Sequence, residues 1–284
     1  MKTTQPIKKR KVGFKMIKQH ATGIIIAMAI IITGIITNPF TASAQEFSWG
    51  FKKAQNEVPP EAGATFDKML EKYGAVYKGK SDDKVMYLTF DCGYENGYTE
   101  SILNTLKKEN IQATFFLTGH YLTSATPLVK RMVNEGHEIG NHSDKHPNMA
   151  RLTEQQMVDE WHRFDKKLAE LTNVERTVYA RPPEGVFNED LLRVGQDAGY
   201  RHIFWSVAFK DWLKDKPQGW KYAYDNLMSQ MHPGAIILMH TVSPDNAEAL
   251  PKFIKDAEKK GYRFDSINNL LNETPFFVEN KNIG

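Results

Sequence analysis

Short apolar runs alternate with amphipathic stretches along the chain from Lys84 onward. The runs are rich in β-branched and aromatic residues or are almost continuously apolar, as strands buried on both faces of a parallel sheet are. They predict strands at Val85–Phe90, Ala113–Leu117, Glu138–Gly140, Thr177–Ala180, His202–Trp205, Ala235–Met239 and Arg263–Phe264.

The amphipathic stretches between these runs predict helices, and Asn110, Gly136, Gly199 and Gly261 follow four of them as stop signals. The expected helices are Thr99–Glu109, Pro127–Glu135, Glu154–Leu171, Glu189–Asp197, Ala223–Met231, Glu248–Lys260 and Ser266–Leu271. Strands that alternate with helices imply a parallel sheet with right-handed crossovers. About seven such units fit a barrel better than an open sheet, so the sequence predicts an α/β fold with a distorted (β/α) barrel.

The first 44 residues hold seven basic side chains and no acidic one, and the last of these basic residues is Lys18. An uncharged, Ile-rich run extends from Ala21 to Ile36, and Ala42-Ser43-Ala44 matches the small-x-small pattern of a signal-peptidase site. The segment predicts a signal peptide over residues 1–44, cleaved near Ala44, and therefore export across the membrane. The alternative is an uncleaved anchor through residues 21–36, although a spanning helix usually needs roughly 20 apolar residues.

Residues 45–83 form a different kind of segment, rich in Pro, Gly and aromatic residues. We expect this N-terminal extension to pack on the main domain through Phe47–Phe51 and to form a short helix over Phe66–Tyr73. The main domain is expected over residues 84–271, followed by a C-terminal tail over residues 272–284.

The net charge of +3 is misleading, because it comes from the first 44 residues. Without them the 37 basic residues fall to 30 against 34 acidic ones, a net charge of −4. A mildly acidic body has no electrostatic reason to bind nucleic acid. The single cysteine, Cys92, excludes an intramolecular disulfide.

Polar residues gather directly after five of the predicted strands. In a barrel these strand ends meet on one face, where the active sites of such folds lie. The clusters are Asp91–Asn96, His142–His146, Arg181–Gly185, Asp211-Trp212 and His240.

His142 and His146 are four residues apart, so a helical turn would place both imidazoles on one side. Two imidazoles so placed are a common half-site for a divalent metal such as zinc; the alternative is two unrelated surface histidines. Asp91 ends a strand that should be buried, where a carboxylate needs a partner. It either serves the chemistry or caps the next helix, and Thr99–Glu109 begins too late for capping.

Arg181 precedes two prolines that fix its loop, so its guanidinium is placed to orient a carboxylate; the alternative is a surface arginine before a rigid turn. His240 ends an apolar strand, and its pKa near neutrality suits a general acid, although it could also be a core histidine. Asp211 could tune His240, and Trp212 could be a platform for a sugar; otherwise the two are a surface acid and a rim aromatic residue.

The remaining histidines have no such neighbours and are expected to be structural or on the surface, and the remaining tryptophans are expected to be core or packing residues. They are His20, His120, His137, His162, His202, His232, Trp49, Trp161, Trp205 and Trp220.

The five clusters in this order resemble the motifs of the polysaccharide deacetylases, the NodB-homology domain of carbohydrate esterase family 4. The motif residues are Thr89-Phe90-Asp91-Cys92-Gly93, His142-Ser143-Asp144-Lys145-His146, Arg181-Pro182-Pro183-Glu184-Gly185, Asp211-Trp212 and Leu238-Met239-His240. The resemblance implies the barrel fold and an enzyme that hydrolyses N-acetyl groups of glycans, with a divalent metal as cofactor.

The resemblance also implies residue roles. Asp91 is the base that activates water, Arg181 orients Asp91, and His240 protonates the leaving amine with help from Asp211. The metal, expected to be zinc, binds His142 and His146 and stabilises the oxyanion. Substrate would contact Trp212, Pro182 and Asn96.

Two positions depart from the family pattern. Cys92 stands where most members carry a second Asp that binds the metal, so it is either a thiolate ligand or a neutral packing residue. Ala208 stands where some members carry an additional acid, which leaves open what tunes His240.

The version of the first motif, together with the Phe47–Phe51 extension, is most similar to the muramic acid deacetylases of spore-forming bacilli. This implies action on N-acetylmuramic acid in peptidoglycan glycan strands during spore cortex synthesis, on the way to muramic δ-lactam. Two alternatives are a deacetylase acting on another polysaccharide, such as chitin oligomers or xylan, and an inactive carbohydrate-binding homologue.

Overall fold

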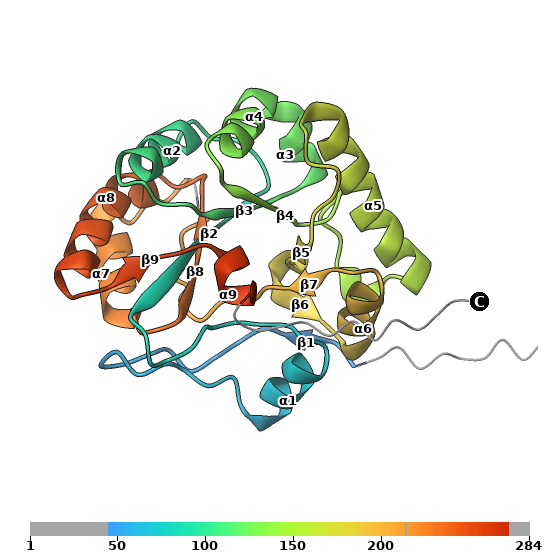
Figure 1. Cartoon of the computed structure of the whole chain (residues 1–284), viewed down its shortest axis with the longest axis horizontal. Helices are drawn as coiled ribbons and strands as arrows, with labels where there is room; N and C mark the ends of the chain where they lie inside the picture. The colour runs from blue at the N-terminus through green and yellow to red at the C-terminus, as the bar shows by residue number, and fades with distance from the viewer. Residues whose placement is uncertain (1–44, 214, 273–284) are drawn as a thin grey trace, which may run out of the picture. The chain divides into compact units, whose positions relative to one another are not determined.

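The computed structural model of the chain describes residues 45–213 and 215–272. Seven strands form one curled parallel sheet, a half-barrel, in the order β7-β5-β4-β3-β2-β8, and β9 also pairs with β2 (Figure 1). This confirms the predicted α/β barrel-like fold. The strands are β2 Val85–Cys92, β3 Thr114–Leu117, β4 Glu138–Asn141, β5 Tyr179–Ala180, β7 Arg201–His202, β8 Ala235–His240 and β9 Arg263–Phe264.

Most of the helices cover the outer side of the sheet, and Figure 1 shows them as an arc around the strands. Alternate residues of β2, such as Leu88 and Phe90, pack with the helices in the largest hydrophobic cluster. The helices are α1 Ala64–Lys72, α2 Thr99–Lys108, α3 Gly119–Ser124, α4 Thr126–Asn134, α5 Glu154–Leu171, α6 Glu189–Asp197, α7 Trp220–Gln230, α8 Pro244–Lys259 and α9 Ile267–Asn272, with 3₁₀ turns η1 Met149–Arg151 and η2 Pro183–Gly185.

The inner side of the sheet is filled by a smaller cluster of apolar side chains. Tyr87 of β2 and Ile236 of β8 meet Ile267 and Leu270 of α9 there. The gap between the edge strands β7 and β8 is bridged by single backbone pairings, which join Val76 to Ile203 and residue 207 to residue 237. The curled sheet therefore encloses a packed interior.

The N-terminal extension packs on the sheet domain through its aromatic residues. Strand β1 (Phe47–Ser48) pairs antiparallel with β6 (Val186–Phe187), and the indole of Trp49 donates a 3.0 Å hydrogen bond to the carbonyl of Trp205. The ring of Trp49 lies 4.7 Å from the ring of Phe204. The extension thus contacts the loop that carries Arg181, because β6 follows that loop directly.

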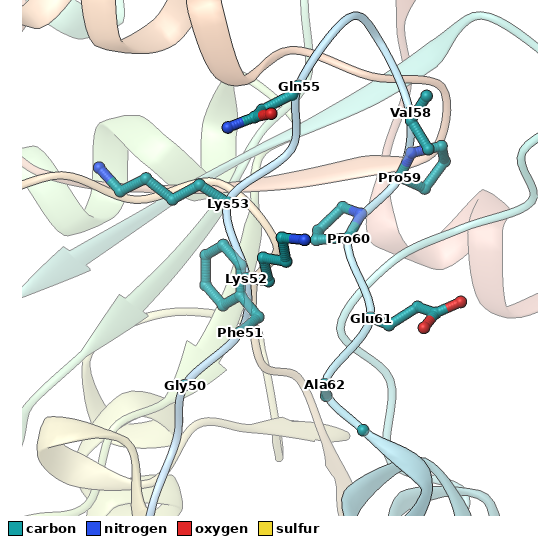
Figure 2. Close-up of a pocket in the computed structure, with 11 residues that line it drawn as sticks. Gly50, Phe51, Lys52, Lys53, Gln55, Val58, Pro59, Pro60, Glu61 and Ala62 are labelled. Atoms are coloured by element: carbon teal, nitrogen blue, oxygen red, sulfur yellow. The ribbon is translucent and has the colours of Figure 1, made fainter.

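The extension contains a hollow of about 640 Å³ between its segments 50–55 and 58–63, and Figure 2 shows the residues that line it. Lys53 and Gln55 lie on one side of it and Pro60 and Glu61 on the other. All the residues that line the hollow belong to the extension, so it is separate from the five motif clusters.

Several predicted boundaries were wrong. The strand expected over His202–Trp205 ends at His202, because the guanidinium of Arg181 takes the carbonyls of Ile203 and Phe204 as acceptors. The strand expected from Thr177 begins at Tyr179, because the backbone and hydroxyl of Thr177 donate to Asp165 instead.

Helix α3 was not predicted; it has only six residues and begins with Gly119, a residue of low helix propensity. The side chain of Thr118 caps this helix by accepting from the backbone N–H of Tyr121. Helix α8 begins four residues before the predicted Glu248, since Pro244 is tolerated in the first helical turn.

The predicted signal peptide over residues 1–44 and most of the expected tail over residues 272–284 lie outside the described residues. Among the residues that are described, no helix combines the length and apolarity needed to cross a membrane.

Candidate active site

The carboxyl ends of β2 and β8 place the expected base and acid side by side. The two strands are parallel neighbours, and Asp91 is the register partner of His240. Phe90 and Cys92 pack in the hydrophobic cluster beneath the helices, so the side chain of Asp91 between them points to the opposite face of the sheet. Asp91 does not cap α2, whose N-cap residue is Tyr98.

Arg181 holds Asp91 through a fully buried ion pair. Its Nη1 donates to Asp91 Oδ1 at 2.7 Å, and the side chains of the two residues are 0% and 7% exposed. The Nε of Arg181 donates to the carbonyl of Ile203 at 2.9 Å, and the guanidinium lies 4.0 Å from the ring centre of Phe116. The arginine therefore has a fixed orientation and is not on the surface.

The charges around Asp91 keep it ionised at neutral pH. Burial alone would raise the pKa of Asp91, but the electrostatic interactions with Arg181, His142 and His240 outweigh it and hold the pKa below the ordinary value of 3.8. The guanidinium of Arg181 is the permanent positive charge among them at neutral pH. A carboxylate in this state can accept a proton from water.

Asp211 pairs with His240 as a second, separate unit. Its Oδ1 lies 2.7 Å from Nδ1 of His240, and its Oδ2 accepts the backbone N–H of His240 at 2.8 Å. Because a carboxylate accepts at Nδ1, that nitrogen carries a proton and Nε2 faces away from Asp211. Asp211 is the acidic residue that pairs with His240, so the alanine at position 208 does not leave His240 without one.

The charge of Asp211 favours the protonated form of His240. Burial alone would lower the pKa of His240, but the charge and hydrogen bond of Asp211 and the charge of Asp91 outweigh it, even against Arg181. The pKa of His240 therefore lies above the ordinary value of 6.5. An imidazolium of this kind is suited to donate a proton near neutral pH.

The rings of His142 and His146 meet at 4.9 Å between centroids, with an interplanar angle of 72°. The rings meet without the helical turn that would place both imidazoles on one side. Ser143 and His146 instead adopt left-handed backbone conformations, with φ of 65° and 56°. Such conformations are uncommon for residues other than glycine and cluster at functional sites.

Hydrogen bonds from β4 and α5 stabilise this histidine loop. Asn141 Oδ1 accepts the backbone N–H of Ser143, and Ser143 Oγ accepts that of His146. Asp144 pairs with Lys167 of α5 and packs against Gly119, where an added Cβ would lie only 1.9 Å from Asp144 Oδ1. The loop conformation therefore depends on contacts far away in the sequence.

His142 has the tautomer and charge of a metal ligand. Its Nδ1 donates to the carbonyl of Arg181 at 2.8 Å, which leaves the lone pair of Nε2 free. Burial lowers the pKa of His142 to about 4, against the opposing charge of Asp91, so the ring is neutral at pH 7. Nε2 lies 3.6 Å from Asp91 Oδ2, on the side where the base is held.

Cys92 lies on the other face of β2 from Asp91 and packs with Leu117 and Met239 in the hydrophobic cluster. Its Sγ accepts a hydrogen bond from the hydroxyl of Thr241 at 3.4 Å. Burial raises the pKa of the Cys92 thiol, with a further contribution from the charge of Asp91, so the sulfur is protonated. This geometry is that of a packing residue.

The three expected substrate contacts differ in exposure. Trp212 is 50% exposed, and its ring lies 5.7 Å from that of His240, so it offers an aromatic surface beside the acid. Asn96 is exposed, although its amide donates to the carbonyl of Val242 at 2.9 Å. Pro182 is buried and presents little surface to a sugar.

Sequence reasoning missed Asn246 of α8, whose amide donates to both Asp211 Oδ2 and the carbonyl of His240. A signal was available in the helical spacing of Asn246, Leu250, Phe253 and Ala257, which places a lone polar residue on the buried face of an amphipathic helix. Starting the predicted helix at Glu248 removed Asn246 from that face.

Comparison with known proteins agrees with this site. Residues 78–203 match the polysaccharide deacetylase family. An uncharacterized 30.6 kDa protein of Geobacillus stearothermophilus is 53% identical over 228 residues, which are 80% of this chain and 86% of that protein. Peptidoglycan-N-acetylmuramic acid deacetylase PdaA of Bacillus subtilis is 45% identical over 249 residues, or 88% of this chain and 95% of PdaA.

The solved structure of Bacillus subtilis PdaA, a family 4 carbohydrate esterase, superimposes with a TM-score of 0.80. The match covers 81% of this chain and 99% of that chain, at 47% sequence identity. Fold and site together define a carbohydrate N-deacetylase, a hydrolase that acts on amide bonds of acetylated sugars. The chain belongs to the polysaccharide deacetylase family, as its five motifs predicted.

Deacetylases of this family use a divalent metal, and the donor set here fits one through two imidazoles. His142 and His146 would hold it, and when bound it would polarise the acetyl carbonyl and stabilise the charge that develops on its oxygen. Within residues 45–213 and 215–272, no three side chains of His, Cys, Asp or Glu are grouped so that together they could hold a metal ion. The site therefore provides two protein ligands for a metal, His142 and His146.

Asp91→Asn should abolish turnover while the protein stays folded, because the amide cannot accept a proton from water but still accepts from Arg181. The expected loss of kcat is about 10² to 10⁴-fold, as for other general bases. Acetate release and far-UV circular dichroism measure the two effects. Asp82→Asn, an exposed position before β2, is the matched control and should keep full activity. Activity of Asp91→Asn within a few-fold of the wild type would refute the assignment.

Replacing His142 and His146 together with Ala should remove bound divalent metal, whereas Cys92→Ser should leave metal affinity unchanged. The reason is that the imidazoles are the free donors and the thiol is buried and protonated. Elemental analysis and titration calorimetry with Zn²⁺ measure the affinity, and the exposed His120→Ala is the control. Tight zinc binding that Cys92→Ser abolishes would show that the sulfur is a ligand.

Proposed function

We propose that the protein deacetylates N-acetylmuramic acid residues in the glycan strands of peptidoglycan. The main support for a hydrolytic activity is that a candidate base and a candidate acid lie side by side on adjacent strands. Asp91 and His240 are register partners, and each is held by its own buried partner, Arg181 or Asp211. Two titratable groups with opposite shifts in pKa, one kept ionised and one kept protonated, are what acid–base hydrolysis of an amide needs.

The residues divide the reaction between them. Asp91 accepts a proton from the water that attacks the acetyl carbonyl carbon. His240 then donates a proton to the sugar nitrogen as the bond between that nitrogen and the carbonyl carbon breaks. The products are acetate and a free amino sugar. Arg181 keeps the carboxylate in place throughout, since its other hydrogen bonds are to backbone carbonyls.

The choice of muramic acid rests on the relatives. The protein named as an N-acetylmuramic acid deacetylase aligns with 88% of this chain, including the N-terminal extension. Chitin oligomers and xylan remain the competing substrates, because the catalytic residues would serve any acetylated sugar. An inactive carbohydrate-binding homologue is disfavoured, because Asp91, Arg181, Asp211 and His240 all make the contacts that catalysis needs.

The proposal includes zinc as the metal, because imidazole nitrogen is a preferred zinc ligand. It includes export, based on the signal-peptide pattern of residues 1–44, with anchoring through residues 21–36 as the alternative. It also includes a role in the spore cortex, where the free amine of muramic acid could close with the lactyl carboxyl of the same sugar to give muramic δ-lactam.

The test is acetate release from purified peptidoglycan, with and without its peptide stems, compared with chitin oligomers and acetylated xylan. We expect release from peptidoglycan, with new amines on muramic acid identified by mass spectrometry of the digested glycan. Chelation should abolish release and Zn²⁺ should restore it.

Release from chitin oligomers alone would reject the muramic acid proposal and keep the deacetylase. New amines on glucosamine rather than muramic acid would do the same. No release from any of these substrates in the presence of Zn²⁺ would favour the inactive homologue.

Asp211→Asn should move the alkaline limb of the pH–rate profile to lower pH. His240 must be protonated to act as the acid, so activity falls as the pH rises through its pKa. The charge of Asp211 raises that pKa above 6.5, and removing the charge lowers it again. Profiles of kcat against pH, measured with saturating substrate, check the shift.

The control for this change is Asp225→Asn, which removes an equal charge from an exposed pair with Lys221 on α7. Its profile should overlay that of the wild type. An alkaline limb that stays in place in Asp211→Asn would mean that His240 is not the group that titrates there.

A further inference from the structure

Asn246 of α8 lies behind the Asp211–His240 pair and contacts both of its members. The residue is fully buried. Its Nδ2 donates to Asp211 Oδ2 and, at 3.0 Å, to the backbone carbonyl of His240. One amide group thus joins the carboxylate of one residue to the backbone of the other.

The orientation of this amide is set by its neighbours. Both atoms that its nitrogen faces are acceptors, so exchanging nitrogen and oxygen would place an oxygen against a carboxylate. The other end, Asn246 Oδ1, is buried and has no hydrogen-bond partner among the described residues. An unpaired buried amide oxygen opposes folding, so Asn246 is a poor packing residue, and its favourable contribution comes from the two bonds that Nδ2 donates.

We propose that Asn246 is a positioning residue for the catalytic acid. It fixes the orientation of the His240 ring through its bonds to Asp211 and to the backbone at the end of β8. The proposal rests on the deacetylase chemistry of the family and not on the identity of the sugar.

The hydrogen bonds of Asp211 show how this positioning works. Asp211 Oδ2 receives Nδ2 of Asn246 and the backbone N–H of His240, so the carboxylate cannot rotate without losing both bonds. Its other oxygen is left for Nδ1–H of His240. Without the amide, only the backbone bond would hold Oδ2, and the ring of His240 could turn together with the carboxylate.

Helix α8 is a suitable anchor for this contact. Leu250, Phe253 and Ala257 continue the buried face that Asn246 begins, and all three are 0% exposed. The charged groups that act on the ring of His240 come from other elements: Asp91 from β2, Arg181 from the loop after β5, and Asp211. Helix α8 therefore acts on His240 through the neutral amide of Asn246 and not through a charge.

The test replaces Asn246 with Leu, whose side chain has the same number of heavy atoms and the same branching but cannot donate a hydrogen bond. We expect kcat for acetate release from peptidoglycan to fall about tenfold, because misplacing a catalytic group by a fraction of an ångström has effects of this order. KM should stay within about twofold, since Asn246 reaches the reaction only through Asp211 and His240. The melting temperature should fall by no more than about a few degrees, because the change removes the unpaired oxygen together with the two bonds that Nδ2 donates.

A second readout needs no substrate. In protein labelled with ¹⁵N-histidine, the Nδ1–H proton of His240 should give a low-field resonance in the wild type, because it is shared with a carboxylate. His240→Gln assigns that resonance. In Asn246→Leu we expect it to broaden or to move upfield. This readout separates the proposal from the choice of sugar, since it holds even if peptidoglycan is not the substrate.

The matched control is Leu250→Ala, one turn further along the same buried face. It should lower the melting temperature and leave both kcat and the resonance unchanged. If Asn246→Leu does not fold, Asn246→Ala is measured in the same way. Wild-type kcat with an unchanged resonance in the folded variant would overturn the proposal, and so would a Leu250→Ala variant with the same losses.

Discussion

The site depends on one buried ion pair, between Arg181 and Asp91. Taking two charges out of water is costly, and the pair is tolerated only because its remaining polar atoms have partners. The backbone carbonyls of Ile203 and Phe204 accept from the guanidinium, and Phe116 lies against its face. Removing one partner of such a pair usually costs about 3–5 kcal/mol, because the other charge stays buried. Strand β7 ends where the following carbonyls accept from this arginine, so the end of β7 and the position of the proposed base depend on the same contacts.

The strand–helix alternation was sufficient to predict the class of fold, because a buried parallel strand such as Val85–Phe90 has a local signature. The two-residue strands β5 and β7 have no such signature. The carbonyls of Ile203 and Phe204 bond to an arginine 22 and 23 residues earlier, and no local pattern reports such a partner. The same holds for Thr177, which Asp165 of α5 draws away from the sheet. Strands β5 and β7 are short because side chains compete for the backbone groups beside them.

The candidate site could be predicted as a set of residues but not as a geometry. Asp91, Arg181 and His240 follow strands, and the parallel topology brings them together. The left-handed backbone at Ser143 and His146 could not be read from the sequence, since neither residue is glycine. It depends on Asn141, Asp144 and the helix α5, which is distant along the chain. The neutral amide behind the acid was missed because its helix was started too late.

The pairing of β1 with β6 shows that the part of the chain that matches the family is smaller than the part that folds together. The family match begins at residue 78, yet Trp49 donates its backbone N–H to Gly185 of the arginine loop and packs on Phe204, whose carbonyl faces the guanidinium of Arg181. A recombinant domain that begins at the start of the family match would retain every motif residue. It would lose the contacts of Trp49 with the loop that holds Arg181. For this enzyme, the smallest piece worth expressing begins upstream of Phe47.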